Sequence, residues 1–187
     1  IKDIEEAKNH LLLATGSGLY TLNKRSYSIQ PFANSVLKDR RVTAMFVDKQ
    51  SNIWIGTNNA VFVFRSDFSL IKKYTHDPKV KHSIPAGTTN MFYEDREGNL
   101  WMGIWCAGLH KLDKKADRFI PSPTLGGRNN PFRMFQDDHG QRWIASWGDG
   151  MYLFNPQDGK DCYRSVTIKN KRRGEGNEDL CYNILQD

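Results

Sequence analysis

The sequence predicts an all-β protein, a β-propeller of about four four-stranded antiparallel blades that is a fragment of a larger propeller. Three observations lead to this prediction. One pattern recurs four times along the 187 residues, each copy contains several short apolar stretches, and turn residues separate these stretches. Repeats of ~40 to 45 residues have the size of propeller blades, whereas solenoid coils usually repeat every ~20 to 30 residues.

Each copy is centred on an apolar strand with a bulky anchor residue. The aligned segments are 10–15, 52–57, 99–104 and 141–146, and their anchors are Leu12, Trp54, Trp101 and Trp143. Their length of about five residues and the flanking turns favour a strand over a buried helix. The small residue two positions after each anchor predicts close approach of a neighbouring backbone; these residues are Ala14, Gly56, Gly103 and Ala145.

An acidic residue stands six positions before each anchor: Glu6, Asp48, Asp95 and Asp137. In the later copies it opens a turn that contains glycine. We expect the Asp side chain to accept backbone N–H groups there, while glycine supplies a positive φ. These acids are poor candidates for a catalytic pair, because equivalent positions belong to different blades and glycosidase chemistry needs two carboxylates at one bond.

The other strands follow from the same alignment. The predicted first strands include 42–47 and 90–94, the third strands are 19–22, 61–64, 109–112 and 151–154, and the more polar fourth strands include 70–74, 118–120 and 162–166. The predicted repeats are 1–41, 42–88, 89–130 and 131–180, with the start of a fifth at 181–187. Because segments 1–6 and 182–187 align, we expect one surplus inner strand. The remaining blades of a parent propeller, or a second copy in a homodimer, are the expected partners of its open faces.

The repeat resembles the two-component regulator propeller repeat. The residues that carry the resemblance are Glu94, Asp95, Gly98, Leu100, Trp101, Gly103, Gly108 and Leu109, with segments 54–57 and 150–156 supplying the rest. The first copy departs from the pattern with Leu12 in place of Trp, and the second has Ala60 where Gly is usual.

This resemblance implies a periplasmic ligand-sensing segment of a hybrid two-component system, with an oligosaccharide from a complex glycan as the ligand. It also implies that the segment is not an enzyme. A histidine kinase would lie elsewhere in the parent protein, and contact with the membrane would be made only through parts of the parent outside this chain.

Two loops between second and third strands carry tryptophan at matching positions, Trp105 and Trp147, and Asp149 follows the second. An exposed indole can stack on the apolar face of a sugar ring. The connecting loop adds Arg128, Asn129 and Asn130, which offer donors to hydroxyls, carboxylates or sulfates. The alternatives are that the indoles pack between blades and that the loop is only a surface connection.

Composition and motifs give little support to other classes of function. The net charge of +6 is weak support for an anionic partner, and no nucleic-acid-binding motif accompanies the basic cluster at 169–173. Neither a cofactor motif nor a metal-ligand cluster is found, and Cys106, Cys162 and Cys181 leave pairing of the last two open. A carbohydrate-active enzyme on a propeller scaffold and a protein-interaction propeller remain the alternative functions.

Overall fold

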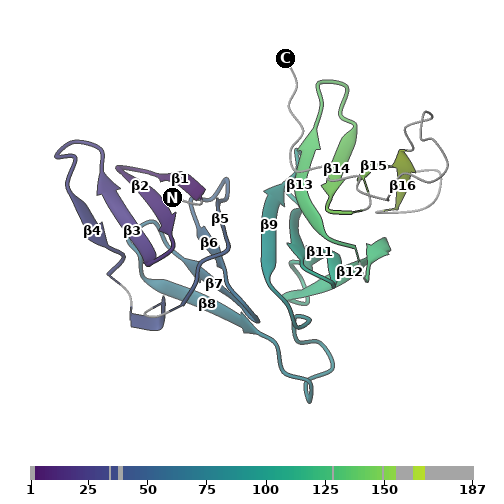
Figure 1. The fold of residues 1–187 in the computed structure, drawn as a ribbon, viewed down its shortest axis with the longest axis horizontal. Helices are drawn as coiled ribbons and strands as arrows, with labels where there is room; N and C mark the ends of the chain where they lie inside the picture. Colours follow the sequence, from purple (N-terminus) through teal and green to yellow (C-terminus); the bar gives the residue numbers. More distant parts are fainter. Residues whose placement is uncertain are drawn as a thin grey trace.

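A computed structural model describes residues 3–33, 35–37, 40–127, 129–148, 150–154 and 162–166. In these ranges the chain forms β-strands and one short 3-10 turn, η1 (Ser35–Leu37). The strands make four antiparallel four-stranded sheets, and in each sheet the strands are ordered as in the chain (Figure 1). The predicted all-β fold with four antiparallel blades is therefore confirmed.

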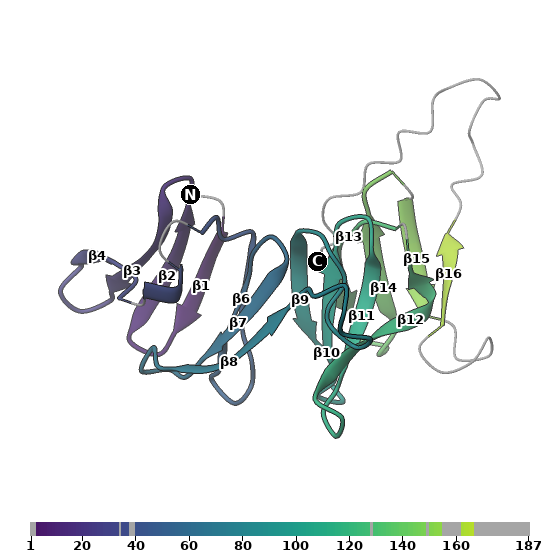
Figure 2. The ribbon, with the colours of Figure 1, turned by 90° about the horizontal axis from the view of Figure 1, so that it is seen from below.

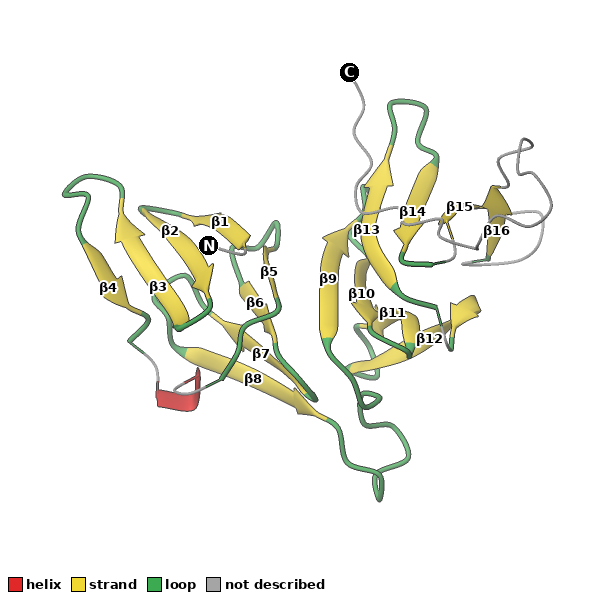
Figure 3. Cartoon of the chain, in the orientation of Figure 1, coloured by secondary structure: helices red, strands yellow, loops and turns green. Residues whose placement is uncertain are grey.

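The strands have the following bounds, and Figure 3 shows them with their connecting turns. Blade 1 is β1 (Asp3–Ala7), β2 (His10–Thr15), β3 (Gly18–Asn23) and β4 (Ile29–Pro31). Blade 2 is β5 (Ala44–Val47), β6 (Ile53–Gly56), β7 (Ala60–Phe64) and β8 (Leu70–Thr75). Blade 3 is β9 (Thr89–Glu94), β10 (Leu100–Ile104), β11 (Gly108–Asp113) and β12 (Arg118–Gly126). Blade 4 is β13 (Pro131–Gln136), β14 (Arg142–Ser146), β15 (Gly150–Phe154) and β16 (Tyr163–Val166).

The blades follow one another in chain order, as the view from below shows (Figure 2). The first strands contact each other in succession, β1 with β5, β5 with β9 and β9 with β13. These are the inner strands. The second strands β6 and β10 are buried throughout, whereas the outer strands β4 and β8 are mostly exposed. In blades 1 and 2 the middle strands are therefore more buried than the outermost strand, as expected for a propeller.

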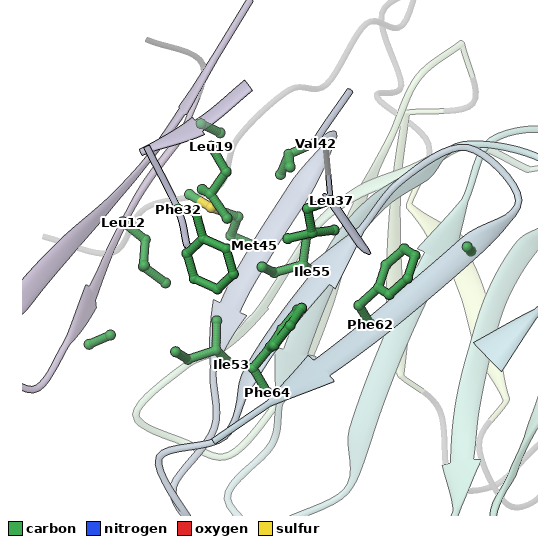
Figure 4. Close-up of a cluster of buried hydrophobic side chains, with 13 residues drawn as sticks. Leu12, Leu19, Phe32, Leu37, Val42, Met45, Ile53, Ile55, Phe62 and Phe64 are labelled. Carbon is green, nitrogen blue, oxygen red and sulfur yellow. The ribbon is translucent and has the colours of Figure 1, made fainter. Parts of the chain in front are cut away.

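The anchors pack between successive blades. Leu12 lies with Ile53, Ile55, Phe62 and Phe64 in the core between blades 1 and 2 (Figure 4). Trp54 packs with residues of blade 3, and Trp101, which is 0% exposed, packs with residues of blade 4. Burial of each large apolar side chain contributes about 1.5–3 kcal/mol, so these interfaces hold the blades together.

The turn acids also hold the tryptophan anchors. Asp48, Asp95 and Asp137 each accept a hydrogen bond from the indole Nε1 of the anchor six residues later, at 2.9 Å in every case. The other carboxylate oxygen accepts the backbone N–H four residues on, at 2.7–2.8 Å. One carboxylate thus shapes the hairpin turn and orients the indole of its own blade. Spacing alone suggested only the turn.

The small residues after the anchors make room for the next blade. A Cβ atom on Gly56 would lie 2.6 Å from Cβ of Thr89 at the start of β9. A Cβ on Gly103 would lie 2.8 Å from the carbonyl oxygen of Pro131 at the start of β13. The close backbone approach expected from the pattern is present at Gly103, whereas Gly56 makes room for the side chain of Thr89. Both contacts bring in the inner strand of the following blade.

Some strands differ from the predicted ranges. β12 continues to Gly126, past the predicted end at 120, because Gly126 pairs with Gly108 across a bulge and Leu125 is buried in the core of blades 3 and 4. Leu125 and Gly126 therefore belong to the outer strand of blade 3. The predicted start of a fifth repeat at 181–187 and the basic cluster at 169–173 lie outside the described residues. Within the described part, no helix is long and apolar enough to cross a membrane.

Candidate functional site

Three aromatic side chains meet at the loops that end β10 and β14 and at the start of β13. The ring of Trp105 lies 5.9 Å from that of Trp147 and 6.0 Å from that of Phe132, and the rings of Phe132 and Trp147 are 5.8 Å apart, measured between centroids. All three side chains are half-buried. We call them the aromatic rim. The two tryptophans singled out from the sequence are therefore neighbours, and each keeps part of its surface accessible.

The backbone fixes the two tryptophans in equivalent ways. The N–H of Trp105 donates to the carbonyl oxygen of Thr88 at 2.8 Å, and the N–H of Trp147 donates to that of Asn130 at 2.9 Å. Thr88 and Asn130 directly precede the inner strands β9 and β13. The backbone of each tryptophan is thus attached to the connection that enters the inner strand of its own blade, which gives the rim a defined position.

The other predicted site residues divide into two groups. Asn130 lies at the rim, where its Oδ1 accepts the N–H of Cys106 at 2.7 Å, and Asn129 beside it is half-buried. Asn130 therefore positions both tryptophan loops through its two carbonyl oxygens. Arg128 and Asp149 lie outside the described residues.

The inner strands of all four blades surround a hollow of about 530 Å³, which we call the axial hollow. Its lining residues with polar groups are Asp3, Glu5, Thr43, Asn90, Tyr93 and Arg133. Phe132 lines it as well, so the aromatic rim and the axial hollow are continuous. The volume falls in the range of ~300–1,000 Å³ that is typical of small-ligand sites.

Two groups in the hollow are unusual. Burial in the hollow and the neighbouring carboxylate of Asp3 raise the pKa of Glu5 to about 7, although the charge of Arg133 opposes this shift. The side-chain Nδ2 of Asn90 is buried and has no hydrogen-bond partner among the described residues. A buried amide without a partner is costly, so a polar ligand or water in the hollow would satisfy it.

Sequence reasoning did not find Phe132, Asn90, Glu5 or Arg133. For Asn90 and Arg133 the only signal was a polar residue within an otherwise largely apolar inner strand, such as Arg133 between Phe132 and Met134. Because the four inner strands are far apart in the chain, the alignment could not show that these positions face one hollow.

Other chemistry-bearing residues have local roles. Nδ1 of His76 lies 2.9 Å from the carbonyl oxygen of Ile84, and the buried His110 has its Nδ1 3.4 Å from that of Gly108. Among the described residues, no group of three or more potential ligands could hold a metal ion. Cys106 is exposed and Cys162 is buried, whereas Cys181 lies outside the described residues, so the pairing of the last two stays a prediction.

Comparison with known proteins agrees with the repeat. Residues 36–59 match the two component regulator propeller family. These residues carry a two component regulator propeller repeat. They span β5, the turn acid Asp48 and the anchor Trp54 of blade 2. An inner strand, a turn acid and an anchor are the features that recur in each blade. The propeller repeat expected from the sequence is therefore confirmed over these residues. No curated protein matches the sequence of the chain.

Solved structures show the same fold. The chain resembles the extracellular domain assigned to the hybrid two component system BT4673 of B. thetaiotaomicron, with a TM-score of 0.74 and 16% identity over 98% of this chain and 24% of that one. It resembles the corresponding domain of BT3049 with a TM-score of 0.69 and 16% identity over 88% and 24% of the two chains. The chain also resembles virginiamycin B lyase of Staphylococcus aureus, with a TM-score of 0.60 and 10% identity over 89% of this chain and 56% of that one.

Identities this low show the fold alone. The chain spans about a quarter of the length of the two extracellular domains. The two component regulator propeller repeat therefore supplies the architecture and the anchor positions. The rim and the hollow are described from this chain's own residues.

Proposed function

We propose that the chain is an extracytoplasmic ligand-sensing segment of a hybrid two-component sensor and that it binds an oligosaccharide at the aromatic rim and axial hollow. The observation that carries this proposal is the meeting of Trp105, Phe132 and Trp147 beside a hollow lined by polar side chains.

The chemistry of the site suits a neutral sugar chain. Aromatic faces pack on the C–H faces of sugar rings, and carboxylate, amide and guanidinium groups exchange hydrogen bonds with hydroxyls. The hollow offers acceptors on Asp3 and Glu5 and donors on Asn90 and Arg133. An apolar platform beside convergent polar groups is the usual composition of a small-ligand site.

In this proposal the site signals that the ligand is bound and does not catalyse a reaction. Asp3 and Glu5 belong to one strand, and Oδ2 of Asp3 accepts the N–H of Met45 at 3.2 Å. Two carboxylates on one strand do not flank a bond in the way that glycoside hydrolysis requires. A histidine kinase elsewhere in the parent protein would respond to the bound ligand. The periplasmic location is supported by the extracellular domains that share the fold.

The proposed partners of this segment are further blades of the parent propeller. Leu11 in blade 1 occupies the repeat position of Ile53, which is 0% exposed in blade 2, yet Leu11 is only half-buried. On the same face of blade 1, Ile4 is 53% exposed and Ile29 is 59% exposed. An apolar sheet face of this kind favours a covering blade. A homodimer in light scattering would show instead that a second copy covers it.

The test is a screen on a glycan array followed by calorimetry with the glycans that bind. Trp105→Ala and Trp147→Ala should each weaken binding at least tenfold while the midpoint of thermal unfolding stays close to that of the wild type. Tyr27→Ala is the matched control, because Tyr27 is an aromatic residue 77% exposed on blade 1. Equal affinities for all four proteins, or product formation from the glycan, would contradict the proposal.

A further inference from the structure

A second cavity lies on the outer side of blade 3, between the loop that follows β8 and strands β11 and β12. Its volume is about 510 Å³. Figure 1 shows this loop extending from the end of β8 before the chain enters β9. The cavity shares no lining residue with the aromatic rim or the axial hollow. We call it the lateral pocket.

The side chain of Arg118 brings a guanidinium group to the lateral pocket. Arg118, at the start of β12, has a buried Nε atom with no hydrogen-bond partner among the described residues. The exposed side chain of Lys81 lines the opposite loop. A buried guanidinium nitrogen that lacks an acceptor is costly, and carboxylate or sulfate oxygens are its best-matched acceptors.

Among the described residues that line the pocket, Asp77 has the only carboxylate, and this group is partly engaged in the loop. Its Oδ1 accepts the N–H of Lys79 at 2.9 Å, while the backbone of Asp77 exchanges two further hydrogen bonds with Ser83. Oδ2 of Asp77 has no partner among the described residues, so it can accept a ligand hydroxyl. With Arg118 and Lys81 opposed by one carboxylate, the lining carries a positive excess before the histidines are considered.

The walls of the pocket are flat and apolar. Phe119 and Ile84 are buried, whereas Val80 is 53% exposed and Ile120 is 38% exposed. Three prolines complete the lining: Pro78, Pro85 and Pro121. Exposed aliphatic side chains next to rigid proline rings form a surface that suits the C–H face of a six-membered ring. Such a ligand would also cover apolar area that now faces water.

Three histidines line the pocket, namely His76, the exposed His82 and the buried His110. Nδ1 of His76 lies 2.9 Å from the carbonyl oxygen of Ile84 and holds the loop in shape. Burial lowers the pKa of His110, so its imidazole is neutral near pH 7. Arg118 and Lys81 are therefore the permanently charged basic side chains among the lining residues.

We propose that the lateral pocket binds an anionic sugar ring, carrying a carboxylate or a sulfate that Arg118 and Lys81 recognise, with a hydroxyl donating to Asp77. The choice of sugars rests on the proposed function, but the pocket and its charge do not. An acidic glycan could thus be distinguished from a neutral one at a site separate from the aromatic rim.

Calorimetry with galacturonic acid, galactose 6-sulfate and neutral galactose tests this proposal. We expect the two charged probes to bind at least tenfold more tightly than galactose, and a preference between them would identify the anionic group. Arg118→Gln and Lys81→Gln should each weaken binding of the charged probes, Arg118→Gln by about tenfold or more. Arg25→Gln removes the same charge from an exposed position on blade 1. This variant should bind the charged probes with an affinity within about twofold of that of the wild type.

Several outcomes would overturn the proposal. These are equal affinity for charged and neutral probes, the absence of binding by both charged probes at millimolar concentration, and an Arg118→Gln protein that unfolds like the wild type and binds the charged probes equally well. Because Lys81 is exposed, Lys81→Gln keeps the test valid if Arg118→Gln does not fold. The Trp105→Ala and Trp147→Ala proteins should retain binding of the charged probes. A failure at the rim is therefore distinguishable from a failure at the lateral pocket.

Discussion

Nη1 of Arg142 lies 3.2 Å from Oδ2 of Asp95, and this buried ion pair joins blade 4 to blade 3. The guanidinium carbon of Arg142 also lies 3.8 Å from the ring centroid of Phe154. Asp95 is 0% exposed and accepts the indole N–H of Trp101 with the same oxygen. One carboxylate therefore links a turn, an anchor and the neighbouring blade.

The ion pair predicts a large effect of Arg142→Met on stability. Removal of one partner leaves the carboxylate of Asp95 buried without its counter-charge, and such losses cost about 3–5 kcal/mol. Chemical denaturation should show a decrease of this order. Arg96→Gln is the control, because Arg96 is exposed and lies 3.8 Å from Asp138, and it should change stability by less than about 1 kcal/mol. Equal effects of the two substitutions would contradict the role of the pair.

The glycines that lie against the next inner strand predict a second effect on stability. Gly103→Ala should destabilise the protein by about 1–3 kcal/mol, because the added Cβ would lie 2.8 Å from the backbone oxygen of Pro131 and 2.7 Å from Cγ of Met91. Gly16→Ala, where no atom lies within 4 Å of the added Cβ, is the matched control and should be neutral or slightly stabilising. Denaturation midpoints compare the two variants. A neutral Gly103→Ala would show that the blades can separate without cost.

Glu5 predicts a pH dependence of stability. Its pKa is about 7 in the folded protein and about 4.3 in an unfolded chain, so the folded state binds more protons between these values. The unfolding free energy should therefore fall as the pH rises from about 5 to 8. Glu5→Gln should remove this decrease and be more stable at pH 8 by about 1–2 kcal/mol, which is below the full linkage value because the hollow admits water.

The control for Glu5 is Glu6→Gln, at an exposed residue on the same strand that pairs with Lys24. This variant should keep the pH dependence of the wild type. Parallel stability curves for the wild type and Glu5→Gln between pH 5 and 8 would contradict the assignment of the titration to Glu5. Asp3 and Arg133 face the same hollow and remain unchanged in both variants.

The blades could be predicted from the sequence because each one repeats the same local arrangement of residues. The anchor, the small residue two positions later and the turn acid recur at fixed offsets, so even Leu12, which replaces a tryptophan, was recognised by register. The structure shows why these offsets are fixed: the acid bonds its own anchor, and the small residue lies against the next inner strand.

The candidate site could be predicted only in part. Trp105 and Trp147 stood out because they occupy equivalent loops, but Phe132 is an ordinary apolar residue in its strand. The axial hollow and the lateral pocket each combine side chains from segments that are distant in the chain. Repeat alignment compares equivalent positions, whereas a site is formed by positions that are not equivalent.

The indole signals of the five tryptophans give the most direct test of the sugar-binding site. Trp54, Trp101 and Trp143 have their indole N–H groups bonded to turn acids, whereas Trp105 and Trp147 form the rim. In a two-dimensional ¹H–¹⁵N spectrum recorded during titration with a neutral oligosaccharide that binds, the signals of Trp105 and Trp147 should shift and saturate while the other three stay in place. Binding that leaves the signals of Trp105 and Trp147 unmoved would contradict the account.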